Sequence, residues 1–191
     1  MTKQAWQAAL ADLITDPKEL FVLLALSTDL LPAAYAAAEA FPLRVPRGFA
    51  ARMTKGDPND PLLRQVLPLD AELTTTVGYQ RDPLQETKVN PLPGLLHKYH
   101  GRVLVTLTSV CAIHCRYCFR RYFPYQENNP GRLGWDKIMD YLHADDSISE
   151  VILSGGDPLA VNDGLLRQFS DLLSTIPHIK RLRLHTRLPV V

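Results

Sequence analysis

The spacing of apolar residues along the chain changes near residue 42 and again near residue 94. From Ala5 to Ala40 apolar side chains recur at helical intervals, and Asp16 before Pro17 has the residue types of an N-cap and a first turn. Between residues 42 and 94 prolines interrupt every longer element. We expect short helices and ordered turns in this part, with Arg47 to Thr54 as one helix candidate.

After Gly94 predicted strands alternate with predicted helices, which is typical of a parallel α/β fold. The strands are expected over residues 102–108, 150–153 and 181–186, and the helices over residues 133–143 and from Asn162 or Asp163 to about Thr175. We therefore divide the chain into a helical and proline-rich extension, residues 1–94, and the first part of a barrel, residues 95–191.

The expected fold class is α/β, a partial (β/α) TIM-like barrel preceded by an N-terminal helical extension. Three strands with two crossover helices cannot close a barrel and leave a long exposed edge. We therefore expect the sequence to be the first part of a larger protein, incomplete at its C-terminus. A small, complete open sheet is the alternative.

Composition and charge exclude several classes of protein. The chain has 191 residues, of which 46% are hydrophobic and 21% charged, and its formal net charge is +1, as in a soluble globular protein. This charge does not favour nucleic acid as a partner. We find neither a signal peptide nor an apolar run of membrane length, and therefore expect a cytoplasmic protein without membrane contact.

The three cysteines, Cys111, Cys115 and Cys118, lie within eight consecutive residues directly after the first predicted strand. They are too close together and odd in number for a disulfide framework, which favours reduced thiols. Thiolates are soft ligands that hold iron in clusters. Three of them leave one iron of a [4Fe–4S] cluster without a protein ligand, and a small molecule can react at that open position.

Two other interpretations of the cysteines compete with the cluster. Their spacing would also place three small apolar side chains on one face of a helix, where cysteine is often simply buried. A zinc site is the second alternative, with His100, His114 or His143 as the fourth ligand.

The spacing C-x-x-x-C-x-aromatic-C, with Tyr117 as the aromatic residue, resembles the motif of the radical S-adenosylmethionine superfamily. The resemblance implies that the three cysteines bind a [4Fe–4S] cluster whose open iron takes the methionyl group of S-adenosylmethionine, with Tyr117 near the cofactor. It also implies that Gly155, Gly156 and Asp157, at the end of the second strand, contact the methionyl amino group. An ordinary tight turn is the alternative for this glycine pair.

Longer segments resemble the lysine 2,3-aminomutase family, and some of them its branch that makes β-lysine for elongation factor P. The family segments are PGLLHKY (93–99), CRYCFRR (115–121), SGGDPL (154–159) and HTRLPV (185–190). The segments of the branch are RVPR (44–47), DPLLRQV (60–66), LLHKYH (95–100) and IPHIKR (176–181).

This resemblance implies an isomerase that converts L-α-lysine to (R)-β-lysine with S-adenosylmethionine and pyridoxal 5'-phosphate. A separate ligase would attach the product to elongation factor P, and flavodoxin or ferredoxin would be the electron donor. A homo-oligomer is left open. The alternatives are another radical aminomutase, for example one acting on glutamate, and a non-catalytic iron–sulfur or zinc module.

Two basic residues match family positions. Arg120 aligns with the arginine that pairs with the substrate carboxylate, and its alternative is a solvated basic run with Arg116 and Arg121. Lys98 falls where the free-lysine enzymes usually carry an arginine near the cofactor phosphate, and its alternative is a surface lysine. The lysine that anchors pyridoxal phosphate belongs to a later part of the family's chain, so no catalytic residue is assigned here.

Overall fold

The structure is a computed structural model that describes residues 5–131 and 134–191 in two compact units. The first unit contains the residues up to Gln80 together with Ala112–Arg121 and Val191, and the second contains Arg81–Cys111 and Tyr122–Val190. The predicted division into domains at residue 94 stays a prediction. Within the described residues no helix is long and apolar enough to cross a membrane.

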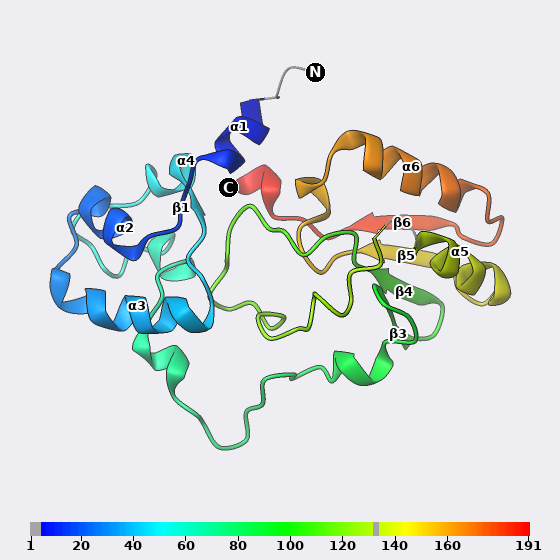
Figure 1. The fold of residues 1–191 in the computed structure, drawn as a ribbon, viewed down its shortest axis with the longest axis horizontal. Helices are drawn as coiled ribbons and strands as arrows, with labels where there is room; N and C mark the ends of the chain where they lie inside the picture. The colour runs from blue at the N-terminus through cyan, green and yellow to red at the C-terminus, as the bar shows by residue number, and fades with distance from the viewer. Residues whose placement is uncertain (1–4, 132–133) are drawn as a thin grey trace. The chain divides into compact units, whose positions relative to one another are not determined.

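The first unit is built from short helices and one small β-ladder (Figure 1). β1 pairs antiparallel with β2, with Ile14 opposite Val45. The elements are α1 (Ala5–Ala11), β1 (Leu13–Ile14), α2 (Pro17–Leu24), η1 (Thr28–Leu30), α3 (Leu31–Ala40), β2 (Val45–Pro46), α4 (Arg47–Ala50), η2 (Leu63–Gln65) and η3 (Asp70–Leu73).

The predicted helical region from Ala5 to Ala40 is divided into separate helices because β1 and a proline interrupt it. The predicted cap is confirmed, since the Asp16 side chain accepts a hydrogen bond from the backbone N–H of Lys18 at the start of α2. A proline disfavours the helical conformation of the residue before it, here Asp16, so α1 does not continue into α2. The candidate helix at Arg47 is shorter than predicted and ends at Ala50.

The core of the first unit includes residues of the cysteine loop. Ile113 is buried in the same apolar cluster as Leu20, Phe49 and Leu63, and Cys115 packs against this cluster. The cysteine loop is therefore partly an element of the N-terminal unit, although it follows a strand of the second unit in sequence.

The second unit is an open four-stranded sheet in the order β3-β4-β5-β6, with β4, β5 and β6 parallel and β3 antiparallel to β4. Its elements are η4 (Glu86–Val89), β3 (Leu95–Tyr99), β4 (Arg102–Val105), α5 (Trp135–Ala144), β5 (Glu150–Leu153), η5 (Pro158–Ala160), α6 (Asp163–Ser174), β6 (Arg181–Leu184) and η6 (Leu188–Val190). The α/β class is thus confirmed, and among the described residues the sheets are open.

Local sequence predicted most elements of this unit, but missed one strand. β5 has the predicted bounds, and Asn162 caps α6 by accepting from the backbone N–H of Leu165. β3 was not expected, although it forms a hairpin with β4 in which only His100 and Gly101 separate the paired residues Tyr99 and Arg102. β4 and β6 end earlier than predicted, and Leu133, the predicted start of α5, lies outside the described residues.

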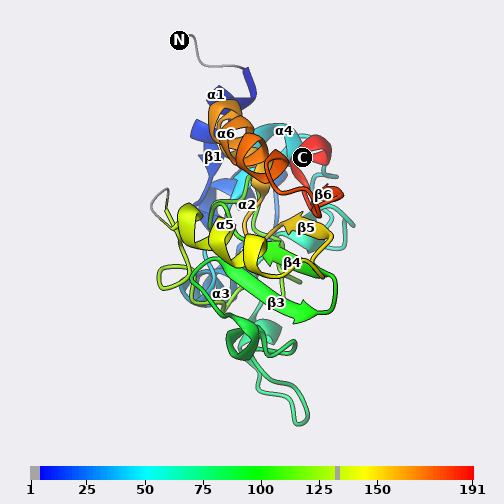
Figure 2. The same ribbon diagram turned by 90° about the vertical axis from the view of Figure 1, so that its right-hand side faces the viewer.

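Helices α5 and α6 pack on the same face of the sheet (Figure 2). The rings of Trp135 and Phe169 meet edge to face at 5.2 Å between centroids, and both are buried with Val103 and Val151 of the strands. Right-handed crossovers between consecutive parallel strands place their helices on one side in this way. The parallel strands consequently end at one edge of the sheet, from which the cysteine loop and the Gly155 turn emerge.

Candidate functional site

The cysteine loop contributes thiols to both units. Cys111 belongs to the second unit, and Cys115 and Cys118 belong to the first, where the backbone N–H of Cys118 donates to the carbonyl of Cys115 at 3.0 Å. None of the three forms a disulfide, and all three are partly buried. Across residues 5–131 and 134–191, no group of three or more His, Cys, Asp or Glu side chains is arranged to hold a metal ion.

The donor set itself fits an iron–sulfur cluster. Thiolates bind iron, and these three thiols are neither oxidised to a disulfide nor fully exposed. Burial raises the pKa of the Cys118 thiol above its usual value, so the free thiol holds its proton and a bound metal would have to displace it. The helical-stripe alternative is wrong, because residues 111–118 form turns rather than a helix.

Backbone hydrogen bonds join the loop to the first unit at two of the family-like segments. The N–H of His114 donates to the carbonyl of Arg44 at 2.9 Å, and the N–H of Arg116 donates to the carbonyl of Gln65 at 2.8 Å. The His114 ring adds a contact between its Nδ1 and the Pro42 carbonyl, 2.8 Å apart, and stacks on Phe41. Burial lowers the pKa of His114, which favours a neutral ring.

A buried ion cluster forms the centre of this contact. Nε and Nη2 of Arg116 donate to the two carboxylate oxygens of Glu72 at 2.9 and 2.6 Å, and Nη1 of Arg121 lies 2.7 Å from Glu72 Oε2. The side chains of Arg116, Arg121 and Glu72 are only 6%, 10% and 13% exposed. The alternative of a solvated basic run is therefore wrong for Arg116 and Arg121, because both pair with a carboxylate inside the unit.

Glu72 is ionised in this environment. Burial alone would favour its neutral form, but the hydrogen bonds and charge of Arg116, together with the hydrogen bond of Arg121, lower the pKa of the Glu72 carboxyl below its usual value. No local pattern indicates this role of Glu72, because Glu72 lies 44 residues from Arg116 in a proline-rich segment. Phe41 completes the cluster, with the guanidinium carbons of Arg116 and Arg121 at 5.0 and 4.8 Å from its ring centroid.

Asp60 organises the segment that carries Gln65. Its Oδ1 accepts from the backbone N–H groups of Leu62 and Leu63 at 2.9 Å, and its Oδ2 accepts from the N–H of Thr54 at 3.0 Å. The hydrogen bond from Leu63, with those from Thr54 and Leu62, lowers the pKa of the Asp60 carboxyl despite its burial. Asp60 thus joins two turns of the first unit through one side chain.

Replacing Asp60 with alanine is expected to reduce the free energy of unfolding by about 1–2 kcal/mol at neutral pH, since the N–H groups of Leu62, Leu63 and Thr54 lose their acceptor. A lowered pKa means that the carboxylate stabilises the fold above its unfolded pKa of about 4, and that this stabilisation is lost as the pH falls through the lower pKa of the folded protein. Urea unfolding at neutral and acidic pH measures both effects.

The control for this prediction is Asp57→Ala, because Asp57 accepts one exposed hydrogen bond, from the N–H of Asn59. It should cost less stability than Asp60→Ala. Equal losses in the two variants, or an acid dependence in Asp60→Ala that is as large as in the wild type, would contradict the role assigned to Asp60.

Gly155 and Gly156 form a junction between strand ends of the second unit. The N–H of Gly156 donates to the carbonyl of Thr108 at 3.0 Å, and the N–H of Asp157 donates to the carbonyl of Val110 at 2.9 Å. A Cβ on Gly156 would lie 2.5 Å from the Thr108 oxygen and 2.7 Å from the Val110 oxygen. Glycine is therefore required at 156 so that the turn can lie against the backbone that leads to Cys111.

Asp157 is a buried acceptor of several hydrogen bonds. Its Oδ1 accepts from the N–H of Leu159 at 3.0 Å and from the hydroxyl of Thr186 at 2.5 Å, and its Oδ2 accepts from the N–H groups of Arg187 at 2.7 Å and Leu188 at 3.0 Å. These contacts hold the segment after β6 against the glycine turn. They give Asp157 a structural role, and its predicted contact with the methionyl amino group stays a prediction.

The remaining predicted site residues are accessible or partly accessible. Tyr117 is 67% exposed, and the Arg120 guanidinium lies 4.7 Å from the ring centroid of Phe119. Lys98 Nζ donates to the carbonyl of Leu84 at 2.8 Å within the second unit. Their proposed contacts with cofactor and substrate stay predictions.

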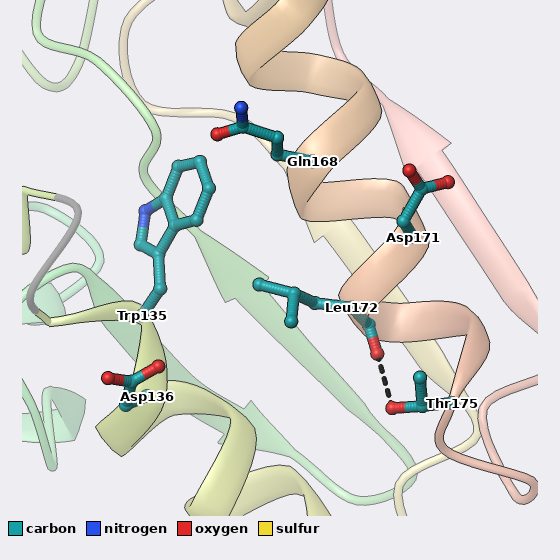
Figure 3. A pocket seen from close by; sticks show the side chains of 6 residues that line it. All are labelled: Trp135, Asp136, Gln168, Asp171, Leu172 and Thr175. Atoms are coloured by element: carbon teal, nitrogen blue, oxygen red, sulfur yellow. Dashed lines mark hydrogen bonds between the residues drawn. The ribbon is translucent and has the colours of Figure 1, made fainter.

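A pocket of about 520 Å³ lies between α5 and α6 (Figure 3). Leu172 points toward it, and the hydroxyl of Thr175 donates to the Leu172 carbonyl at its edge. The lining residues are Trp135, Asp136, Gln168, Asp171, Leu172 and Thr175. None of the predicted site residues lines this pocket, so it is separate from the site expected at the strand ends.

Comparison with known proteins connects the chain to one enzyme family. A family model described as a 4Fe-4S single cluster domain matches residues 99–186, which include the three cysteines and the Gly155 turn. The L-lysine 2,3-aminomutase of Escherichia coli K12 is 48% identical over 191 residues, covering 100% of this chain and 56% of the relative. The chain thus spans little more than half the length of that relative.

Two further relatives of this chain carry the same name. The L-lysine 2,3-aminomutase of Haemophilus influenzae is 46% identical over 189 residues, 99% of this chain and 56% of the relative. That of Clostridium subterminale is 40% identical over 136 residues, 71% of this chain and 33% of the relative. With its cysteine loop and its whole length matched in this way, the chain belongs to the lysine 2,3-aminomutase family.

Proposed function

We propose that this protein is a radical S-adenosylmethionine isomerase that converts L-α-lysine to (R)-β-lysine, the residue that a ligase then attaches to elongation factor P. The observation that carries the proposal is the 48% identity with a lysine 2,3-aminomutase along the whole chain. The open parallel sheet is consistent with the first part of a (β/α) barrel, whose active site would lie at the strand ends. A flavodoxin or ferredoxin would supply the electron.

The chain's own residues have distinct tasks in this proposal. Cys111, Cys115 and Cys118 hold three irons of a [4Fe–4S] cluster and leave the fourth open. When bound, the cluster and S-adenosylmethionine supply the radical, and pyridoxal phosphate holds the migrating amino group. Tyr117 and the turn from Gly155 to Asp157 would border the S-adenosylmethionine.

Two cations would orient the other ligands. Arg120 offers a planar fork that suits bidentate pairing with the lysine carboxylate. Lys98 offers a point charge for the cofactor phosphate, and its bond to the Leu84 carbonyl would be exchanged for that contact. The lysine that anchors pyridoxal phosphate is not assigned to any residue of this chain.

The test is anaerobic reconstitution of the full-length protein, including the part that carries the lysine for pyridoxal phosphate, with iron and sulfide, followed by assay with L-lysine, S-adenosylmethionine and pyridoxal phosphate. We expect β-lysine to form, and the spectrum of the cluster to change when S-adenosylmethionine binds the open iron. A loaded cluster with no β-lysine would refute the substrate, and turnover of glutamate instead would identify the alternative aminomutase. Bound zinc without iron would refute the radical chemistry altogether.

A further inference from the structure

Glu72 occupies the centre of the contact between the N-terminal helices and the cysteine loop. Its two carboxylate oxygens bind Arg116, which lies between Cys115 and Cys118 in sequence, and its Oε2 also binds Arg121. One carboxylate therefore binds an arginine on each side of Cys118 in the sequence. Because the three charged side chains are at most 13% exposed, water cannot replace these contacts readily.

Arg116 also donates hydrogen bonds to three backbone carbonyls of the first unit. Its Nη1 donates to the carbonyl of Phe41 at 2.7 Å, its Nη2 donates to the carbonyl of Ala37 at 3.3 Å, and its own N–H donates to the carbonyl of Gln65. Glu72 completes this set and fixes the fork in one orientation. The turn in which Cys118 donates to Cys115 is thus held by a rigid side chain anchored in the first unit.

The charges of the cluster do not cancel. Two guanidinium groups, those of Arg116 and Arg121, face one carboxylate, that of Glu72, which leaves one positive charge beneath the cysteine turn. Arg121 follows Cys118 by three residues, and its Nη1 is the group that pairs with Glu72 Oε2. Glu72 sets how much of the positive charge remains.

We propose that Glu72 is a positioning residue for the iron–sulfur cluster. Its carboxylate fixes the turn that carries Cys115 and Cys118, and offsets part of the positive charge that Arg116 and Arg121 place beside the cluster. The inference rests on the proposed function only in that the cysteines must bind a cluster. It assigns to the proline-rich segment around Glu72 a task in cluster retention and in the reduction potential.

The experiment compares Glu72→Gln with Asp70→Asn in the full chain loaded with iron and sulfide. Both variants remove one carboxylate from η3, but Asp70 is exposed and, among the described residues, its side chain accepts only from the adjacent N–H of Ala71. Two readouts are measured without turnover, namely the rate of iron loss to a chelator and the midpoint potential of the cluster. Circular dichroism checks that each variant is folded.

We expect Glu72→Gln to lose iron roughly tenfold faster than the wild type, as the loss of a charge-assisted pair would give. Its potential should rise, because an added net positive charge favours the reduced cluster. Asp70→Asn should behave as the wild type. The inference would be overturned if Glu72→Gln and Asp70→Asn lost iron at the same rate and had the same midpoint potential.

Arg121→Met provides a second variant that leaves Glu72 paired with Arg116 alone. It should also lose iron faster, but its potential should fall, because a positive charge has been removed. If Glu72→Gln does not fold, Arg121→Met decides, and wild-type values for it would refute the inference. Wild-type protein that takes up no iron would refute the proposed function and this inference together, whereas a wild-type cluster equally stable in all variants would refute the inference alone.

Discussion

Cys115→Ser is expected to lose the iron–sulfur cluster and, with it, the isomerase activity that we propose for the protein. A serine hydroxyl is a hard ligand that holds its proton at neutral pH, so two thiolates would be left for a cluster that needs three. The fold should survive, because serine is close to cysteine in size and Cys115 only packs at the edge of the apolar core of the first unit. The measurements are the iron content per chain after reconstitution and the yield of β-lysine.

The matched control is Ser109→Ala, a change in the same loop at an exposed residue. It should retain both iron and activity, which would show that the effect belongs to the thiolate rather than to any change of the loop. Full iron content in Cys115→Ser would contradict the assignment of Cys115 as a ligand.

Gly156→Ala is expected to destabilise the second unit by about 3 kcal/mol. The added Cβ would lie 2.5 Å from the carbonyl oxygen of Thr108 and 2.7 Å from that of Val110, and both are backbone atoms that cannot rotate away. The same two oxygens accept the hydrogen bonds of Gly156 and Asp157, so the loop must move and lose these bonds. Since Val110 precedes Cys111, iron content should fall as well. Urea unfolding and iron analysis measure the two effects.

Gly48→Ala is the control for this substitution. Gly48 lies in helix α4, and a Cβ there would meet nothing within 4 Å. Alanine is the better helix former, so this variant should be neutral or more stable by up to about 1 kcal/mol. Wild-type stability in Gly156→Ala would mean that the turn relaxes and that the close approach is not required.

Each unit contains part of the cysteine loop and holds that part by contacts of its own. The strand ends of the second unit hold its beginning through Thr108 and Val110, and the N-terminal unit holds its later part through Gln65 and Glu72. The helical and proline-rich region is therefore a structural support for the loop rather than a separate appendage.

Local sequence determined the features that depend on near neighbours. The strand Glu150–Leu153, the cap of α2 at Asp16 and the cap of α6 at Asn162 follow from residue types within a few positions, and they were predicted correctly. The sequence alone also showed the spacing of the three cysteines and their place after a predicted strand, because both depend on residues that are close together in the chain. These features led to the family before any tertiary contact was considered.

Only the tertiary structure decided the features that depend on distant partners. The burial of Arg116 against Glu72 and the hydrogen bonds of Asp157 to the segment after β6 each join residues that no local pattern connects. A basic run looks solvated until a carboxylate 44 residues away is folded against it. Burial decides whether such a charge is a surface feature or a structural one, and burial is a property of the whole fold.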